Sequence, residues 1–309
     1  MPGPDLVVVG YPDHLVADHA ALLGAARAQG LTAEVVAPDR IALAVGGAGV
    51  RVLVDGEPWT PRAALPRGVN RPWPFVRQVL DVWAADGVVV VPDPAAAEVC
   101  ADKLATTVRL AAAGVPVLAT LGVVPGAGVT IGPNTVGSGA LVSKPARGSK
   151  ARGVERHDDA GGAATDLGAR RPLVDDSVEH RVVQALATGA GADLRVVVVR
   201  RGFGAEAVAV TRRRAPEHTF VTNVPGAVYS DEPPGTLLHR AATAVAGAAV
   251  DALGLSVGGV DLIEHAGELV VLEVNSWPGL AAEVRGPEIA EALVGVVTHA
   301  LDRRLAPAA

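Results

Sequence analysis

Near its C-terminal end the chain reads VLEVNSWPGL, which combines an apolar strand pattern with side chains that bind cations. Glu273 and Asn275 lie two residues apart, so in a strand both side chains point to the same face. Pro278 and Gly279 then break the strand pattern. A carboxylate beside an amide offers oxygen ligands, which suit a hard divalent cation such as Mg²⁺.

A second carboxylate, Asp261, precedes this strand in what reads as a hairpin, GGVDLIEHAGELVVLEVN. If residues 266–268 form a three-residue loop, with Gly267 at positive φ, Asp261 lies directly opposite Glu273. Two carboxylates that close repel each other unless a cation lies between them. A two-residue loop would instead shift the register by one and put the two carboxylates on opposite faces. The first alternative makes an all-oxygen magnesium site with Asn275, and the second leaves a solvated strand edge.

Lysine is scarce, since of the 27 Lys and Arg residues only three are lysine: Lys103, Lys144 and Lys150. Such positions indicate where a compact ammonium group is needed. Lys144 ends a strand in LVSKPARGSKARGV and is followed by Gly148, Ser149 and Gly153. Glycines let backbone N–H groups surround phosphate oxygens, although surface loops have the same composition. The loop is neither a Walker loop nor GxGxxG, and the earlier VGGAGV favours a simple turn.

Arginines in two later stretches offer planar guanidinium groups for a phosphate or a carboxylate. Arg195 lies at the head of the strand pattern DLRVVVV, and Arg212 lies in TRRRAPEHTFVTNVPG. Arg195 could orient an anion through paired N–H groups. The alternative for Arg195 is a surface ion pair, and the alternative for the arginine triplet is a solvated charge run.

The elements that must position these residues follow from hydrophobic periodicity. Strands alternate with helices in the first 95 residues, which indicates a small parallel α/β domain ending near Pro-rich residues 92–96. A helix containing Lys103 is expected to end at Gly114, and the Gly/Ala/Asp-rich residues 158–170 predict a surface loop. The remaining expected elements are strands over 115–120, 139–148, 180–187, 193–200 and 206–213, helices over 237–253 and 287–301, and the hairpin.

Composition excludes several classes of protein. A chain of 309 residues can bury a core of two or more domains, and with 3% aromatic residues that core must consist mainly of Val, Ala and Leu. A net charge of -6 argues against sequence-independent binding of nucleic acid. Cys100 is the only cysteine, so no intrachain disulfide can form. Neither a signal peptide nor an apolar run of about 18–20 residues is present. These features predict a cytoplasmic protein that binds neither membranes nor nucleic acid.

Taken in order, five stretches resemble the ATP-grasp superfamily, and most closely the RimK-type carboxylate–amine ligases. They are DKLATTVRLAAAGVPVLAT, LVSKPARGSKARGV, VVQALATGAGADLRVVVV, TRRRAPEHTFVTN and GGVDLIEHAGELVVLEVNSWPGL. The resemblance covers about residues 98–283. It implies an α/β (α+β) protein with the ATP-grasp fold. The expected parts are a Rossmann-like pre-ATP-grasp domain over 1–95, a linker helix and central lid subdomain over 96–187, and a C-terminal β-rich subdomain with the metal site over 188–305.

The resemblance also implies ATP with two Mg²⁺ ions, or Mn²⁺, as cofactors. Asp261, Glu273 and Asn275 match the metal ligands. The other matching positions are the ATP-binding lysines Lys103 and Lys144, the glycine-rich loop with Gly148, Ser149 and Gly153, the adenine hinge Gln184, Ala185, Leu186 and Ala187, and the polar residues Arg195, Arg212 and Asn223 that would face the γ-phosphate and the substrate carboxylate. Two positions depart from the pattern. Ala185 replaces the hinge acid that relatives usually carry, and Trp277 replaces a small residue.

The implied chemistry is amide or peptide bond formation. The γ-phosphoryl group of ATP is transferred to a carboxylate, and an amine then displaces phosphate from the acyl phosphate, so that ADP and phosphate are released. No protein nucleophile is needed. Ser138 lacks the GxSxG spacing, and no His/Cys spacing indicates zinc.

The expected partners are a carboxylate and an amine from amino acids, a peptide or a carrier protein. Arg67, Asn70 and Arg71 are candidates for the acceptor side, and a homodimer or homotetramer is possible. Alternative functions are a ligase that crosslinks side chains of a ribosomal peptide, an ATP-grasp kinase, and a nucleotide-responsive binding protein.

Overall fold

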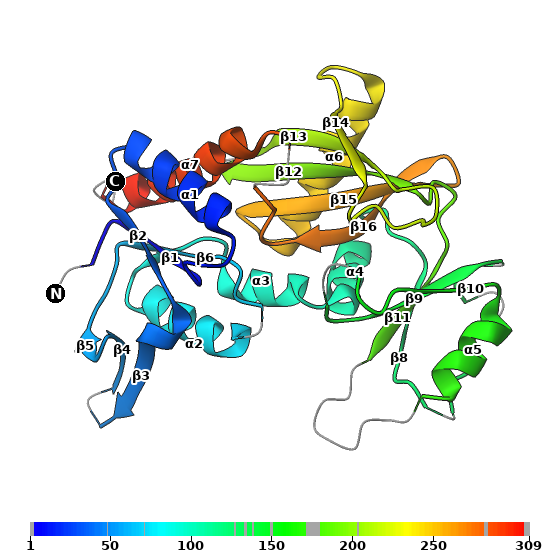
Figure 1. Cartoon of the computed structure of the whole chain (residues 1–309), viewed down its shortest axis with the longest axis horizontal. Coiled ribbons are helices and arrows are strands. Elements are labelled where there is room, and N and C mark those ends of the chain that lie inside the picture. The colour runs from blue at the N-terminus through cyan, green and yellow to red at the C-terminus, as the bar shows by residue number, and fades with distance from the viewer. Residues whose placement is uncertain are drawn as a thin grey trace.

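The computed structural model describes residues 3–305 apart from residues 48, 71, 127, 133, 134, 138, 149, 150, 171–179, 203 and 281–283. Within this part of the chain, helices and strands form three regions: an N-terminal α/β domain, a small lid and a C-terminal sheet (Figure 1). No helix in the described ranges is long and apolar enough to span a membrane.

The N-terminal domain is built on a parallel sheet of order β2-β1-β6-β7. Every residue of β1 is buried, because α1 packs on one face of the sheet and α2 on the other. A small antiparallel sheet, β3-β4-β5, follows a short 3₁₀ helix, and its first hairpin confirms the turn predicted at VGGAGV. The elements are β1 (Leu6–Val9), α1 (Val16–Ala28), β2 (Ala33–Val36), the 3₁₀ helix Pro38–Arg40, β3 (Ile41–Gly46), β4 (Gly49–Val54), β5 (Glu57–Pro58), β6 (Ala63–Pro66), α2 (Trp73–Ala85) and β7 (Val89–Val90).

Two short helices connect this domain to the lid. They are α3 (Pro94–Cys100) and α4 (Lys103–Ala112). Asp93 and Asp102 cap them, because each carboxylate accepts hydrogen bonds from two backbone N–H groups of the first turn. The cap at Asp102 fixes the position of Lys103, the first residue of α4.

The lid is an antiparallel sheet of order β10-β9-β11-β8 with helix α5 on one face. Its elements are β8 (Thr120–Val123), β9 (Leu141–Pro145), β10 (Glu155–His157), α5 (Ala160–Gly168) and β11 (Arg181–Ala185). The surface loop predicted over 158–170 is wrong. Asp159 caps α5 by accepting the Gly162 N–H, and Ala163 and Leu167 are buried against the sheet. The strand predicted over 115–120 is also displaced, since β8 begins only at Thr120.

The C-terminal sheet is antiparallel with the order β14-β13-β12-β15-β16. Helix α6 covers one face with a core of Ala and Val, and α7 packs between the sheet and the N-terminal domain (Figure 1). Leu6 and Leu22 therefore share one core with Val197 and Val294. The elements are β12 (Ala192–Arg201), β13 (Gly204–Arg214), β14 (Val228–Asp231), α6 (Leu237–Leu253), β15 (Val257–His265), β16 (Glu268–Asn275) and α7 (Gly286–Leu305).

Candidate active site

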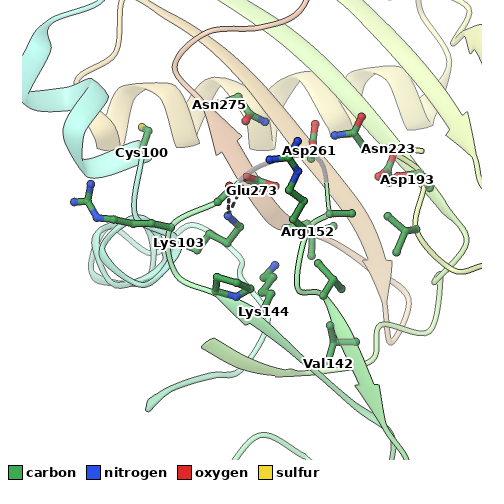
Figure 2. A pocket seen from close by; sticks show the side chains of 18 of the residues that line it. Cys100, Lys103, Val142, Lys144, Arg152, Asp193, Asn223, Asp261, Glu273 and Asn275 are labelled. Carbon is green, nitrogen blue, oxygen red and sulfur yellow. Dashed lines mark hydrogen bonds and ion pairs between the residues drawn. The ribbon is translucent and has the colours of Figure 1, made fainter. Parts of the chain in front are cut away.

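A cavity of about 640 Å³ lies where the lid, the C-terminal sheet and the N-terminal domain meet. Figure 2 shows ionisable side chains pointing into it from α4, the lid and the C-terminal strands. Most of the site residues predicted from the sequence line this cavity: Lys103, Lys144, Gly148, Gln184, Ala185, Leu186, Arg195, Asn223, Asp261, Glu273 and Asn275.

The β15–β16 hairpin places the two carboxylates opposite each other through a two-residue loop and a β-bulge. His265 pairs with Glu268, so the loop has two residues, Ala266 and Gly267, both at positive φ. The three-residue loop considered from the sequence is therefore wrong, and the two-residue loop alone would pair Asp261 with Leu272. A β-bulge next to Asp261 shifts the ladder by one residue. Asp261 consequently pairs with Glu273, as a metal site requires.

The bulge also changes which residues of β16 face the cavity. Leu272 and Glu273 are consecutive, yet both line it, together with Asn275. Val271 and Val274 lie in the core beneath α6 instead. The extra residue thus lets one strand present an apolar side chain and a carboxylate side by side to the same space.

Asp261 lies at the centre of a buried charge network. Arg195 donates two hydrogen bonds to it, at 2.8 and 2.9 Å, and the Nη2 atom of Arg213 lies 3.0 Å from its Oδ2. Burial opposes ionisation of Asp261, but the charges of Arg195 and Arg213 outweigh burial and lower its pKa to about 2. Asp261 is therefore a carboxylate at any physiological pH.

Arg213 joins this centre to Asp193 on β12. Its Nε and Nη2 atoms donate to the two oxygens of Asp193 at 2.6 and 2.7 Å, and Thr222 donates to the same carboxylate. Burial raises the pKa of Asp193, the Arg213 hydrogen bonds oppose this rise, and the charge of Asp261 adds to it. Arg213 Nη1 is buried and has no hydrogen-bond partner among the described residues, so it is an unsatisfied buried donor.

Two lysines approach the carboxylates from the other side of the cavity (Figure 2). Lys103 donates to the Gly148 carbonyl at 2.9 Å, and its ammonium lies 3.5 Å from Glu273 Oε1. Lys144 projects from β9 and is buried. Burial lowers the pKa of Lys144 to about 8, against the attraction of Glu273. Both ammonium groups are suitably placed to neutralise a phosphate chain.

The predicted hinge follows β11 along the cavity wall. Gln184 is buried and its amide donates to Thr120 Oγ1 at 2.8 Å, which ties the hinge to β8. The N–H group of Leu186 donates to the Ala140 carbonyl at 2.8 Å. Because Ala185 carries no polar side chain, this stretch offers a planar ligand its backbone and apolar surface.

Several predicted residues lie elsewhere. Arg212 does not line the cavity. It donates to Glu232 at 2.7 Å on the face of the sheet that α6 covers. Gly153 is not among the lining residues, although Arg152 and Val154 are. Ser149 lies outside the described residues. Of the candidates for the acceptor side, Asn70 lines the cavity and Arg71 lies outside the described residues.

Arg67 is buried beneath the cavity wall, where it pairs with Asp18 and donates to the Pro278 carbonyl at 2.7 Å. Its charge is therefore already neutralised, and its contacts link the N-terminal domain to the segment after β16.

Sequence reasoning missed Arg213, Asp193 and Arg152, which all line the cavity. Strand alternation holds the signal for Arg213. Arg195 pairs with Asp261 on one side and with Thr211 on the other, so the residue of β13 that shares their face is Arg213 rather than Arg212. Arg152 carried no comparable signal, because its place depends on the path of a loop.

The donor set fits a divalent cation that retains water or phosphate ligands. No three His, Cys, Asp or Glu side chains are grouped as metal ligands in the described ranges, and the candidate set consists of two carboxylates and the amide of Asn275. The described contacts of Asp261 use three of the roughly four lone-pair sites of a carboxylate, which leaves one on Oδ1. Hard oxygen donors of this kind, few in number, suit Mg²⁺ bound partly through substrate phosphates.

Known proteins resemble this chain in both sequence and fold. A sequence model for the RimK-like ATP-grasp domain matches residues 165–296. A probable alpha-L-glutamate ligase of Stenotrophomonas maltophilia is 32% identical over 269 residues, which cover 84% of this chain and 86% of the relative.

Two solved structures extend the likeness in fold over nearly the whole chain. The ATP-grasp ligase PsnB, in complex with a precursor variant, Mg and ADP, has a TM-score of 0.63 and 22% identity, covering 96% of this chain and 100% of PsnB. The RimK domain ATP-grasp protein of Sphaerobacter thermophilus has a TM-score of 0.64 and 21% identity, covering 95% of this chain and 99% of that protein.

Proposed function

Because the chain belongs to the RimK-like ATP-grasp ligase family of ATP-dependent carboxylate–amine ligases, we propose that it forms an amide or peptide bond through an acyl phosphate. The substrates proposed are amino acids or small peptides, with ATP and Mg²⁺ as cofactors. The observation that carries the proposal is the pairing of Asp261 with Glu273 in a cavity that also holds Lys103 and Lys144.

In this proposal the nucleotide lies along the cavity from the hinge to the carboxylates. The adenine ring packs against the apolar wall formed by Val142, Leu186 and Leu272, and the hinge backbone binds its edge. Lys103 and Lys144 then contact the phosphates. Each ammonium group neutralises part of a polyanion in a site with little water, where such an interaction is stronger than in bulk solvent.

Asp261, Glu273 and Asn275 would hold magnesium, which supplies neutralisation of the phosphate oxygens during phosphoryl transfer. The low pKa of Asp261 supports this role, because a ligand that is ionised at every physiological pH binds a cation without first losing a proton.

The substrate carboxylate is expected beside Arg213, Arg195 and Asn223. Arg213 and Arg195 line the cavity, and the carboxylates of Asp193 and Asp261 hold their guanidinium groups in place. Guanidinium groups fixed in this way attract a carboxylate through their charge without having to reorganise. Enclosure by the lid limits hydrolysis of the acyl phosphate before the amine attacks.

The experiment that tests the function is a coupled assay of nucleotide products. L-glutamate, the substrate in the name of the S. maltophilia relative, is the first amino acid to test, alone and with a panel of amino-acid, peptide and carrier-protein amines. We expect ADP and phosphate only when both substrates are present, with the amide detected by mass spectrometry. Release of AMP would exclude an acyl phosphate, and ADP formation without any amine would indicate a kinase.

The Glu273→Gln substitution tests the same site. We expect a loss of turnover of about a hundredfold or more, because an uncharged amide cannot replace a carboxylate ligand of Mg²⁺. The melting temperature should change little, since Glu273 faces the cavity and its ion pair within the described part of the chain is with Lys103. Glu268→Gln, on the same strand but exposed, is the matched control and should retain full activity.

A further inference from the structure

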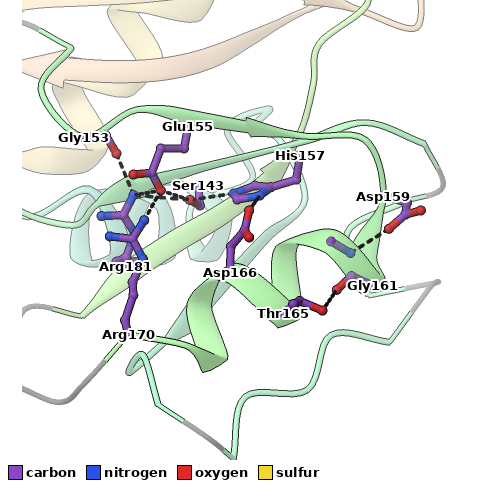
Figure 3. Close-up of polar contacts among 11 residues, drawn as sticks. Ser143, Gly153, Glu155, His157, Asp159, Gly161, Thr165, Asp166, Arg170 and Arg181 are labelled. Atoms are coloured by element: carbon purple, nitrogen blue, oxygen red, sulfur yellow. Dashed lines mark hydrogen bonds and ion pairs between the residues drawn. The ribbon is translucent and has the colours of Figure 1, made fainter.

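The lid contains a Ser–His–Asp relay on the side away from the cavity. His157 Nδ1 lies 3.0 Å from Asp166 Oδ2, and His157 Nε2 lies 2.9 Å from Ser143 Oγ (Figure 3). The order matches that of hydrolase triads. Ser143, however, is 0% exposed, and it points to the face of β9 opposite to Lys144. Its hydroxyl cannot meet a substrate, so the relay must serve another purpose.

Arg181 explains what the relay holds. This buried residue of β11 places its Nη2 atom 2.6 Å from the Gly153 carbonyl, 3.2 Å from Ser143 Oγ and 3.2 Å from Glu155 Oε2. Arg170 pairs with the same Glu155 carboxylate but has no recorded contact with Gly153 (Figure 3).

The strand order places Arg181 beside both ends of the glycine-rich loop. The glycine-rich loop leaves the sheet at Pro145, the last residue of β9, and returns at Glu155, the first residue of β10. Arg181 pairs with Pro145 in the ladder between β11 and β9. One side chain on a third strand therefore binds the returning end of the loop directly beside the point where the loop departs.

The departing end of the loop is held separately. The Ala146 N–H donates to the His180 carbonyl at 3.0 Å, and the Ala146 carbonyl accepts the Lys103 N–H at 2.8 Å. Between the two fixed ends, Gly148, Ala151 and Arg152 line the cavity.

We propose that Arg181 is a positioning residue for nucleotide binding, which fixes the returning end of the glycine-rich loop by binding the Gly153 carbonyl. The inference rests on the proposed function, since it assigns the loop to ATP phosphates. Ser143 Oγ accepts the Arg181 hydrogen bond and also contacts His157 Nε2 and Glu155 Oε2, while His157 Nδ1 contacts Asp166. The relay thus keeps Arg181 aimed at Gly153. Arg181 itself touches no substrate.

The test compares Arg181→Met with the matched control Arg170→Met. Both remove a cation from Glu155, and only the first removes the bond to Gly153. Binding of a non-hydrolysable ATP analogue with Mg²⁺ is measured by calorimetry, and KM and kcat are measured where turnover is found. We expect Arg181→Met to bind the analogue about tenfold more weakly, as for loss of a charged hydrogen bond, and Arg170→Met to stay within about twofold of the unsubstituted chain.

Trypsin provides a readout that a merely structural role would not move, because Arg147 and Arg152 lie in the loop. The analogue should protect these sites in the unsubstituted chain and in Arg170→Met, but not in Arg181→Met. Arg181→Lys, which keeps a cation within reach of Glu155 and Gly153, should recover most of the affinity. Should Arg181→Met not fold, Arg181→Gln carries the same expectation, because its shorter side chain does not reach Gly153.

Equal affinity and protection in Arg181→Met and the unsubstituted chain would overturn this inference alone, as would equal weakening in Arg170→Met. Absence of nucleotide binding by the unsubstituted chain would overturn the proposed function as well.

Discussion

At the residue scale, burial acts on opposite charges with different outcomes in the same cavity. Asp261 stays ionised, with a pKa of about 2, because two arginines contact it directly. The pKa of Lys144 falls to about 8, because desolvation of its charge outweighs the attraction of the nearby carboxylates. At pH 7, about one unit below its pKa, Lys144 is still mostly protonated. A rise of about one to two pH units would remove most of its charge.

This difference predicts a pH dependence of nucleotide binding. A phosphate chain stabilises the protonated form of Lys144, so ATP affinity should be constant below pH 8 and fall as pH rises above it, by up to about tenfold per pH unit. The measurement is calorimetric titration of an ATP analogue between pH 6.5 and 9.5. Lys144→Met should bind more weakly and lose this slope. A slope that persists in Lys144→Met would assign the titration to another group.

Residue types allowed much of the candidate site to be predicted from the sequence. Oxygen donors at alternating positions identified Glu273 and Asn275, and scarcity pointed to Lys103 and Lys144. Arg212 was named through the resemblance to the ATP-grasp ligases, and residue type alone cannot distinguish neighbours in a run of arginines. Their faces differ only through the register with Arg195, which is a property of the sheet.

At the element scale, irregular features decide what a regular pattern cannot. A regular ladder that starts from the Ala266–Gly267 loop would pair Asp261 with Leu272. The bulge at Leu272 pairs Asp261 with Glu273 instead. Helix α5 was missed because residues 158–170 are rich in Gly, Ala and Asp, and glycine in particular is typical of loops and unfavourable in helices. Its formation depends on the Asp159 cap and on burial of Leu167 in the lid core, which are tertiary effects. Helices α1, α6 and α7 and strands β9, β11, β12 and β13 were predicted within a few residues.

The bulge predicts the outcome of deleting Leu272. Without it β16 alternates regularly, and the two-residue loop then pairs Asp261 with Glu273 directly. The proposed metal ligands should therefore keep their places, while the proposed apolar contact of Leu272 with the nucleotide is lost. We expect about tenfold weaker binding of an ATP analogue, with its Mg²⁺ dependence intact, from loss of a contact worth roughly 1–2 kcal/mol. Complete loss of Mg²⁺-dependent binding in a folded protein would mean that the register had slipped.

At the scale of the whole molecule, the two ends of the sequence form one core. Helix α7 packs against α1 and the N-terminal sheet, and the buried pair Arg67–Asp18 reaches across to the Pro278 carbonyl. The cavity wall therefore depends on contacts between segments about 200 residues apart. Such contacts are invisible to local sequence patterns, which is why Arg67 looked like a candidate for binding a substrate.

The buried pair predicts a double-mutant result. Arg67→Met leaves Asp18 as a buried charge without this partner and should lower the free energy of unfolding by about 3–5 kcal/mol. Adding Asp18→Leu removes the buried carboxylate that Arg67 no longer neutralises and should restore much of the lost free energy of unfolding. Urea unfolding of the two single variants and the double variant measures the coupling. Strictly additive losses would show that the pair does not stabilise the fold as a unit.

The lid differs from the rest of the molecule, because Leu141, Leu167 and Val183 belong to a small core of their own. A segment that carries its own interior can be exchanged between related genes without rebuilding the larger body. Recombination near Thr120 and Ala185, the bounds of the lid sheet, would transfer Lys144 and the glycine-rich loop together, and would leave Asp261 and Glu273 behind. Under the proposed function, such an exchange would pass on the binding of the nucleotide phosphates separately from the binding of the cation.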